Sequence, residues 1–511
     1  MSYPSLLWKK MLSECPDPAD DSEMIRKIPQ NVLTDLGLEG ELRPSALRVL
    51  RIPCTAEEIP MRQKLFAATI GSTVFAETLD TLRESTEELE RLTGRIDRAQ
   101  NEDERVLLFP AVLQTWFETA DQWAALQGEE NRFGEIGRHF ASVLAEETAA
   151  ECRKRLEELS GRRQSGLRLI IRGGQVYAAE GQNLRRVQLE EAFDRMGLGD
   201  DIVSARHPSF APPSVIRAYA GVYSGYTEML RGFFAEYRDF FFSGAHDLHE
   251  IAAYSAEISF LTETARYFEK LAENGYPLCY PECTHERLAE LKDLRDPSLL
   301  RRQLSGEQVV PNDLFMASES GGEKLNFFIL SGANGGGKTT FLRACGLAVL
   351  FFITGCPVAA RRGRMYAFDC LYAHFPANEN FENSGRFVNE AERADAILAD
   401  ATENSFALFN ETYSGTDEKK SEEYSSRLAE TLYSRGVFGI YVTHIHALTG
   451  GKIPTLAAVI DESDENRRTY KIRRVGGTKS SFAADILEKY GLDRTSLQKR
   501  LTVCGKEAKH G

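Results

Sequence analysis

Apolar residues recur at helical spacing in three long stretches of the chain, residues 62–98, 106–159 and 213–274. Between residues 62 and 98 they recur as they do on one face of an amphipathic helix. The recurring residues there are Leu65, Phe66, Ile70, Val74, Phe75, Leu79 and Leu82. Residues 106–159 continue the pattern with few glycines or prolines, and no strict heptad persists. The pattern therefore predicts a bundle of long helices over this region.

The pattern changes after residue 160. Leu167–Ile171 and Gln175–Ala179 read as short strands, and Gly173-Gly174 between them is a turn signal, so a β-hairpin is predicted. Nine Lys or Arg residues and three Glu residues lie between 153 and 186. This local basic patch contrasts with the formal net charge of −14 for the whole chain.

Two explanations of the basic patch are open at this point. Its arginines can contact nucleic-acid phosphates. The candidate DNA-binding residues are then Arg162, Arg163, Arg168 and Arg172. Alternatively, the segment is a solvated hairpin whose arginines pair with acidic helices nearby. The acidic net charge argues against a protein coated in basic surface, but a local patch is enough for contact with nucleic acid.

Helical spacing resumes at Pro213, in a stretch rich in aromatic residues. Aromatic rings among charged residues can stack on bases, but at this spacing they are more typical of a core. A further helix, Asp247–Asn274, is predicted to end at Gly275-Tyr-Pro277. Residues 285–326 carry turn signals and are predicted to link this helix to the next domain.

The most informative stretch is the apolar run Phe327–Leu330, which is followed by a glycine-rich loop. Residues 332–339, Gly-Ala-Asn-Gly-Gly-Gly-Lys-Thr, fit G-x-x-x-x-G-K-[ST], and an apolar helix is predicted over Phe341–Ile353. This strand, loop and helix form the context of a phosphate-binding motif, because glycines let backbone N–H groups crowd round phosphates. Lys338 would reach the outer phosphates, and Thr339 would offer its hydroxyl to Mg²⁺. The chain is predicted to bind a nucleoside triphosphate through Gly332, Asn334, Gly335, Gly336, Gly337, Lys338, Thr339 and Thr340.

Two later strands end in polar residues that can act on a bound triphosphate. Ser405–Asn410 is an apolar strand followed by Glu411, which is well placed as general base for the attacking water. Asn410 stands at the position expected to support the metal ion; it can hydrogen-bond a coordinated water but carries no charge. Val437–Thr443 is a further strand, and His444 after it is a candidate sensor of the γ-phosphate.

Length and composition limit the number of domains and argue against a secreted, zinc-binding or membrane protein. At 511 residues the chain has room for about two to four domains. Its nine cysteines are explained best as loose thiols in a reducing cytoplasm. A zinc site at Cys279, Cys283 and His285 would need a fourth ligand that the sequence does not offer. The N-terminus lacks the apolar core of a secretory signal, and Ala344–Ala360 is predicted to be a buried helix rather than a membrane span.

Taken together, these motifs resemble those of the MutS family of DNA mismatch-repair ATPases. The phosphate loop SGANGGGKTT is similar to the family's TGPNMGGKST, and THIHAL at Thr443–Leu448 is similar to THYHEL. Ala401–Glu411 with Gly415-Thr416 resembles ATEYSLVLMDE-x-x-x-GT. Further resemblances are Gly355–Ala360 to G-x-x-V-P-A, Ser384–Glu390 to SGRSTFMVE and Asn274–Pro277 to N-Y-x-x-P.

The resemblance implies a homodimer that binds ATP and Mg²⁺ and uses them to switch a helical clamp on double-stranded DNA, mismatched or branched. It implies that Glu411 activates water, that His444 senses the γ-phosphate and that the basic hairpin is a reduced clamp. It also implies a downstream repair protein, which the sequence does not identify.

The chain departs from the family pattern at several positions. Asn410 stands where the family has the metal-binding Asp, and Arg295-Asp-Pro297 stands for R-H-P. The Ser-Thr pair that follows SGR in the family is missing after Arg386, and no Phe-x-Glu mismatch-reading wedge is recognisable. Turnover of ATP and recognition of mismatches are therefore weaker predictions than nucleotide binding.

The predicted architecture is multidomain, with an N-terminal all-α lever and core region, a small clamp-like β-hairpin insert, and an α/β phosphate-loop NTPase domain of the ABC type. The predicted boundaries are 1–60 for an N-terminal segment, 61–299 for the helical domain with the hairpin at about 160–186, 300–490 for the ATPase domain and 491–511 for a tail. Two other functions stay open. One is a nucleotide-binding module with little or no hydrolysis. The other is a MutS relative that acts on branched DNA, or on a protein or ribosomal target, without preference for mismatches.

Overall fold

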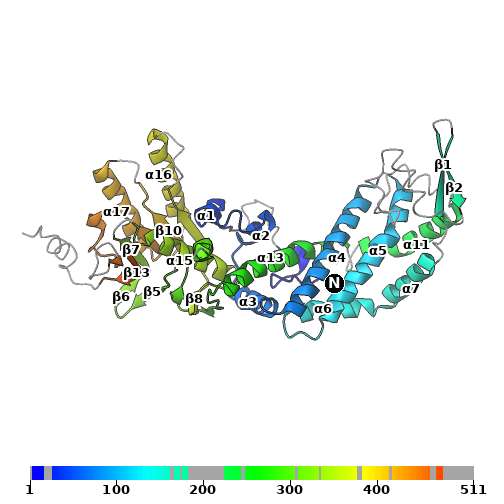
Figure 1. Ribbon diagram of the computed structural model, residues 1–511, viewed down its shortest axis with the longest axis horizontal. Coiled ribbons are helices and arrows are strands. Elements are labelled where there is room, and N and C mark those ends of the chain that lie inside the picture. Colours follow the sequence, from blue (N-terminus) through cyan, green and yellow to red (C-terminus); the bar gives the residue numbers. More distant parts are fainter. Residues whose placement is uncertain are drawn as a thin grey trace, which may run out of the picture. The chain divides into compact units, whose positions relative to one another are not determined.

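The computed structural model describes residues 3–15, 26–99, 101–161, 166–172, 175–181, 224–242, 248–304, 309–332, 335–376, 383–413, 417–460 and 468–475. The chain divides into two units. Figure 1 shows their helices and strands, coloured by position in the sequence. The helical unit comprises Met1–His285 with Ala348–Ala367, and the sheet unit comprises Glu286–Leu347 with Phe368–Gly511. The predicted order, helices first and an α/β region second, is observed.

The described helices of the helical unit are α1 (Gln30–Asp35), α2 (Pro44–Val49), α3 (Glu58–Thr69), α4 (Thr73–Asp97), α5 (Glu102–Ala125), α6 (Arg132–Leu144), α7 (Glu147–Gly161), α11 (Ser224–Phe242), α12 (Leu248–Ala252) and α13 (Tyr254–Glu273). The helices from α3 onward lie where the periodicity predicts them, whereas α1 and α2 lie in the N-terminal segment 1–60, where no helix is predicted. Asn101 caps α5, because its side-chain oxygen accepts the N–H of Glu104 that the helix leaves unpaired. α4 packs along α5, and α5 along α6, which confirms the predicted bundle (Figure 1).

The core of the helical unit is largely aromatic. The ring of Phe109 on α5 lies 5.0 Å from that of Phe234 on α11, centroid to centroid. The fully buried Trp116 lies 4.9 Å from Phe241 in an edge-on arrangement. The aromatic core residues of α11, as their spacing predicted, are Phe233, Phe234, Tyr237 and Phe241. Residues 213–223 lie outside the described residues.

The predicted hairpin is present. β1 (Gly166–Arg172) and β2 (Gln175–Gly181) pair antiparallel, with Arg172 opposite Gln175 and Gly166 opposite Gly181. The two residues between the strands, 173 and 174, lie outside the described residues.

The helix predicted over Asp247–Asn274 is in fact two helices, α12 and α13. Ala253 separates them, and its N–H bonds to Glu250 O, three residues back, so the helical ladder tightens there. The predicted end is correct: Gly275 has φ of 77°, the left-handed conformation that commonly terminates a helix.

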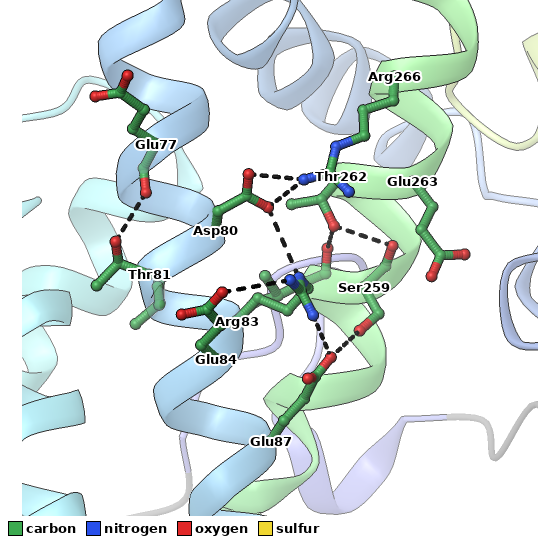
Figure 2. A network of polar contacts seen from close by, with 12 residues as sticks. Glu77, Asp80, Thr81, Arg83, Glu84, Glu87, Ser259, Thr262, Glu263 and Arg266 are labelled. Atoms are coloured by element: carbon green, nitrogen blue, oxygen red, sulfur yellow. Dashed lines mark hydrogen bonds and ion pairs between the residues drawn. The ribbon is translucent and has the colours of Figure 1, made fainter.

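A polar network joins α4 to α13, as Figure 2 shows. Arg266 on α13 binds both carboxylate oxygens of Asp80 on α4, at 2.5 and 2.7 Å. Arg83 Nη1 lies 2.7 Å from Glu87 Oε1, and Ser259 of α13 donates to the same oxygen at 3.5 Å. Partly exposed ion pairs add little stability one by one, but a network of this kind defines how the two helices align.

The N-terminal residues are anchored on α13 by a buried carboxyl group. Glu257, 4% exposed, accepts hydrogen bonds from Ser5 Oγ at 2.5 Å and from Leu6 N at 2.7 Å. Burial raises the pKa of Glu257 to about 7. The hydroxyl of the buried Tyr254 donates to Pro4 O at 2.6 Å and adds a second anchor.

The described part of the sheet unit contains a six-stranded sheet in the order β13-β12-β7-β11-β10-β9. These strands are β7 (Phe327–Ser331), β9 (Cys370–His374), β10 (Ser405–Asn410), β11 (Phe438–Val442), β12 (Thr455–Ile460) and β13 (Arg468–Arg474). All neighbours are parallel except β12 and β13. β7, β9, β10 and β11 are buried along their whole length, as parallel strands usually are. The strands predicted at 327–330, 405–410 and 437–443 are confirmed.

Helices alternate with these strands along the chain. α16 (Asn383–Asp400) connects β9 to β10, and α17 (Glu418–Ser434) connects β10 to β11, as parallel pairing requires. α15 (Lys338–Ile353) follows the phosphate loop and begins three residues before the predicted start at Phe341. Its first ten residues belong to the sheet unit, and residues 348–353 belong to the helical unit.

The sequence predicts a simple link over residues 285–326, but the structure contains strands and helices there. This stretch forms the antiparallel strands β4 (Leu288–Leu294), β5 (Asn312–Ser320) and β6 (Glu323–Leu325), with η4 (Pro297–Leu299) and α14 (Leu300–Leu304) between β4 and β5. The sheet unit consequently starts at Glu286, whereas the ATPase domain was predicted to start at 300. In the helical unit, β3 (Glu282–Thr284) pairs in parallel with β8 (Arg362–Tyr366).

A buried arginine holds the C-terminal end of α15 within the helical unit. Arg62 of α3 is fully buried; its Nε donates to Leu7 O at 2.7 Å and its Nη1 to Thr354 O at 3.2 Å. The guanidinium also lies 4.8 Å from the ring centre of Trp8. Gly355 has φ of 73°, and a Cβ there would lie 2.5 Å from Cβ of Arg62, so glycine is required.

Candidate nucleotide site

The phosphate loop runs from the end of β7 to the start of α15. Gly332, Gly335 and Gly337 have φ of 132°, 71° and 88°, a region that favours glycine. A Cβ on Gly332 would also lie 3.0 Å from Cβ of Ala458. Gly336 lies in the same loop, and Asn334 lies outside the described residues. The backbone of the loop is therefore shaped in a way that residues with side chains would not readily adopt.

Lys338 and Thr339 open α15 and bring two functional groups to the loop. The Lys338 side chain is nearly buried, and its Nζ lies 2.7 Å from Gly332 O. Thr339 Oγ1 lies 3.4 Å from Asn410 Oδ1 at the end of β10. Thr340, the next residue of the helix, is half-buried. Oxygen ligands suit Mg²⁺, so the Thr339 and Asn410 oxygens mark the candidate metal position.

The order of the strands explains why these residues meet. β11 lies between β7 and β10, and the three strands are parallel. The carboxyl ends of parallel strands lie at one edge of a sheet, where ligands bind in folds of this kind. Asn410 and Glu411 at the end of β10, and His444 after β11, therefore come to the edge that carries the phosphate loop.

Glu411 and His444 contact each other. His444 Nε2 lies 2.7 Å from Glu411 Oε1, and their side chains are 41% and 37% exposed, so both are accessible to water and to a ligand. The backbone N–H of Glu411 donates to Val442 O at 2.9 Å. This bond extends the pairing of β10 with β11 by one residue and ties the two polar strand ends together.

The turn after β10 has an unusual backbone. Glu411 and Tyr413 have φ of 53° and 66°, in the left-handed region that residues other than glycine rarely adopt. Each such residue costs on the order of 1–3 kcal/mol and persists only where its surroundings hold it. Between them, the buried Thr412 has its Oγ1 3.0 Å from Nδ1 of His374. Strain of this kind concentrates at functional sites.

Tyr470 beside the loop was not apparent from the sequence pattern. It lies on β13 with φ of 54°, its side chain is about half exposed, and a Cβ on Gly337 would lie 3.4 Å from its ring. Asn312 on β5 fixes this strand, because its Nδ2 donates to Tyr470 O at 3.0 Å and its Oδ1 accepts from Ile472 N at 2.8 Å. Phe315, also on β5, is a second exposed aromatic residue. The signal in the sequence would have been an aromatic residue among the charges of β13.

Asp296, which stands for histidine in the R-H-P pattern, supports the start of α15. Its buried carboxyl group accepts from Ser298 N at 2.9 Å and lies 3.8 Å from Arg343 Nη1. Burial raises its pKa. Arg343 follows Thr339 by one helical turn, so this contact steadies the part of the helix that borders the loop.

The candidate DNA-binding residues are only partly described. Arg168 and Arg172 lie on β1, four residues apart, and Arg162 and Arg163 lie outside the described residues. Across the described ranges, no three His, Cys, Asp or Glu side chains gather into a group that could hold a metal ion. No helix in the described part of the chain is long and apolar enough to cross a membrane.

Comparison with known proteins points to one family. Residues 328–492 match the model of MutS domain V. The DNA mismatch repair protein MutS of Thermus aquaticus is 32% identical over 163 residues, which are 32% of this chain and 19% of that protein. MutS of Microcystis aeruginosa is 27% identical over 276 residues, 51% of this chain and 30% of that protein. Endonuclease MutS2 of Thermus thermophilus is 36% identical over 127 residues, 25% and 17% of the two chains. The matched part thus spans at most 30% of the length of these relatives.

Proposed function

Because this chain belongs to the MutS family, we propose that it is an ATP-dependent DNA-binding protein in which ATP binding and hydrolysis switch a dimeric helical clamp on DNA. The proposed setting is mismatch repair, or the processing of recombination intermediates and other DNA structures. One observation carries the proposal, namely that five groups suited to binding and hydrolysing a triphosphate lie at one edge of the sheet. They belong to Lys338, Thr339, Asn410, Glu411 and His444.

Each side chain has a distinct role in the proposed reaction. Lys338 binds the outer phosphates with a nearly buried ammonium group, where solvent screens its charge little. Glu411 takes a proton from the water that attacks the γ-phosphorus, while the bond to the β,γ-bridging oxygen breaks and ADP leaves with those electrons. His444 Nε2, 2.7 Å from Glu411 Oε1, holds the carboxylate and lies where it can respond to the γ-phosphate.

The residues beside Thr339 fit Mg²⁺, although weakly. When bound, Mg²⁺ neutralises charge on the phosphates. The Thr339 hydroxyl would hold it directly and the Asn410 amide through a coordinated water, and the two oxygens lie 3.4 Å apart. Asn410 is a neutral group where a carboxylate would add an attractive charge, so we propose weaker metal support than an Asp at 410 would give.

We assign the adenine base to the exposed ring of Tyr470 beside the loop. Tyr470 lies beside Gly337, and Asn312 ties its strand to β5. Exposed rings of this kind provide flat apolar surfaces on which a base can stack. Tyr470→Ala is expected to weaken ATP binding more than inorganic phosphate binding.

The proposed partners are a second copy of this chain and double-stranded DNA, mismatched or branched. The family relationship supports both, and the basic segment that contains β1 and β2 supports contact with phosphates. Changing Arg162, Arg163, Arg168 and Arg172 together to Glu is expected to weaken DNA binding and its dependence on salt. If the variant bound DNA as tightly as the parent chain, the hairpin would not be part of the DNA clamp.

The central test measures ATP binding and turnover in the full chain, with and without DNA. Lys338→Ala is expected to weaken ATP binding by at least about 100-fold, since it removes the one lysine that the motif directs at the phosphates. Lys420→Ala is the matched control, because this lysine of α17 is exposed and its side chain pairs with Asp417 nearby. Equal ATP binding by Lys338→Ala and the parent chain would overturn the proposal. The preferred DNA is then identified by competition among homoduplex, mismatched, branched and RNA substrates.

Asn410 favours a second candidate, a nucleotide-dependent binding module that holds ATP without efficient turnover. The neutral amide supports a bound metal ion less than a carboxylate does. Under this alternative the parent chain and Glu411→Gln release phosphate at the same rate, while both still bind ATP. A MutS relative with a branched-DNA, protein or ribosomal target would instead turn over ATP without a preference for mismatches.

A further inference from the structure

A buried histidine connects the turn of Glu411 to α16. His374, the last residue of β9, is fully buried, and both of its ring nitrogens have partners. Nδ1 lies 3.0 Å from Thr412 Oγ1, and Nε2 lies 3.1 Å from Glu390 O in α16. The ring also stacks on Phe409, with centroids 6.3 Å apart. The residue next to the proposed general base is thus held by a side chain from another strand.

The two partners define the tautomer of the ring. A backbone carbonyl can only accept a hydrogen bond, so Nε2 must carry the proton that points to Glu390 O. Nδ1 then presents a lone pair, and the Thr412 hydroxyl donates to it. Burial, and secondly the charge of Arg393, lower the pKa of His374 to about 4, which keeps the ring neutral.

Other contacts fix Thr412 from the opposite side. The hydroxyl of the buried Tyr441 donates to Thr412 O at 2.9 Å and lies 2.8 Å from Ser425 Oγ on α17. Thr412 lies between two residues with left-handed φ, Glu411 and Tyr413. A change in the position of Thr412 would therefore change the direction in which the Glu411 side chain leaves the backbone.

We propose that His374, as the Nε2–H tautomer, is a positioning residue: it holds the Thr412 hydroxyl and thereby sets the carboxylate of Glu411 for ATP hydrolysis. The inference rests on the proposed role of Glu411 as general base. Because the other ring nitrogen bonds to a carbonyl of α16, a displacement of this helix is transmitted to Glu411. His374 thus makes the rate of hydrolysis sensitive to the position of α16.

Two substitutions separate the two hydrogen bonds of the ring. In His374→Asn the amide oxygen takes the place of Nδ1 and can still accept from Thr412, but the bond to Glu390 O is lost. In His374→Gln the amide nitrogen reaches the place of Nε2 and keeps the bond to Glu390 O, but the acceptor for Thr412 is lost. Thr412→Val removes the hydroxyl at nearly constant shape, and Thr431→Val is its control, because Thr431 of α17 bonds only locally to Arg427 O.

We expect His374→Gln and Thr412→Val to lower kcat by about 10- to 100-fold with an unchanged Kd for ATP, since misplacement of a catalytic group acts on the chemical step. The variant that combines His374→Gln with Thr412→Val should show no larger fall in kcat than either single variant. His374→Asn should stay within a few-fold of the parent, and Thr431→Val should match it. An unchanged kcat in Thr412→Val, or equal losses in His374→Asn and His374→Gln, would overturn the proposal.

Two measurements do not depend on turnover and remain informative if the chain does not hydrolyse ATP. Imidazole ¹⁵N shifts should identify the Nε2–H tautomer at His374, and the Nδ1–H tautomer would contradict the inference. Hydrogen exchange of the Glu411 amide, which bonds to Val442 O, should be faster in Thr412→Val than in Thr431→Val. If the parent chain does not hydrolyse ATP but shows the expected tautomer and exchange rates, the proposed hydrolysis is refuted. The proposed hold of His374 on Thr412 then still stands.

Discussion

The two strand ends that carry the proposed reaction are held in different ways. After β10, the turn of Glu411 is fixed from the interior through the backbone bond to Val442 and through Thr412, which is bound by His374 and Tyr441. After β11, the His444 side chain is 41% exposed and meets Glu411 at 2.7 Å. The position of Glu411 is therefore set by the fold, whereas that of His444 depends in part on Glu411 itself.

The largest effect is expected at the fixed strand end. Glu411→Gln keeps the size of the side chain but removes the proton acceptor, and general-base catalysis contributes about 10²- to 10⁴-fold. We expect single-turnover phosphate release to slow by this factor while ATP binding is kept. Equal rates in the variant and the parent would show that the strained turn serves another purpose.

A smaller effect is expected at the exposed strand end. His444→Ala should slow phosphate release by about fivefold, because a hydrogen bond to a half-exposed carboxylate is worth roughly 1 kcal/mol. In the Glu411→Gln background the same substitution should add little, as expected if His444 acts partly through Glu411. If His444→Ala slowed phosphate release more than Glu411→Gln does, the exposed strand end would matter more for the reaction than the fixed one.

Substitutions of Asn410, at the end of β10, should change the affinity of the proposed site for Mg²⁺. Asn410→Asp adds a carboxylate beside Thr339 Oγ1, so the Mg²⁺ concentration needed for half-maximal turnover should fall several-fold. Asn410→Ala should raise it, since no oxygen then faces Thr339. A titration of turnover with Mg²⁺ measures both shifts, and identical curves for all three proteins would exclude a metal role for residue 410.

Glu257 offers a contrast within the helical unit, since it is a buried carboxyl group that anchors the chain. Its folded-state pKa of about 7 lies above its ordinary value of 4.5, so the folded state binds the proton more tightly than the unfolded state does. Its contribution to stability is therefore present at low pH and is lost as the pH rises from 4.5 through about 7. The protection factor of the Leu6 amide, which bonds to Glu257, should fall over this range in the parent chain once the intrinsic exchange rate at each pH is divided out. Glu257→Gln should abolish that dependence, and its persistence in the variant would assign it to another group.

The sequence predicted the central strands because they are buried on both faces. Phe327–Leu330 and Ser405–Asn410 are continuous apolar runs, and that pattern survives without knowledge of the partners. β4 and β5 were missed because half-buried strands mix apolar and charged residues over a short length, as LAELKDL does at 288–294. The break between α12 and α13 was missed because nothing in the residue types around Ala253 disfavours a helix.

The candidate site was predictable as far as the motif reached. Lys338, Thr339, Asn410, Glu411 and His444 were identified because each follows or opens an apolar element at a fixed place. The bond between His374 and Thr412 could not be predicted, since it depends on β9 lying beside β10, residues 38 positions apart in sequence. The only local signal was that His374, like Asn410, is a polar residue at the end of an apolar run.

The buried guanidinium of Arg62 has a practical consequence for work with this protein. It bonds to a carbonyl of the first eight residues and to one just beyond α15, the helix that starts at Lys338. Trimming the chain to begin after Trp8 would remove the Leu7 acceptor and the Trp8 ring from this guanidinium, and the lost hydrogen bond to a charged group should lower stability by about 1.5–3 kcal/mol. Residues 3–8 are therefore part of the packed interior of the helical unit. Purification tags and protease sites are better placed elsewhere on the chain.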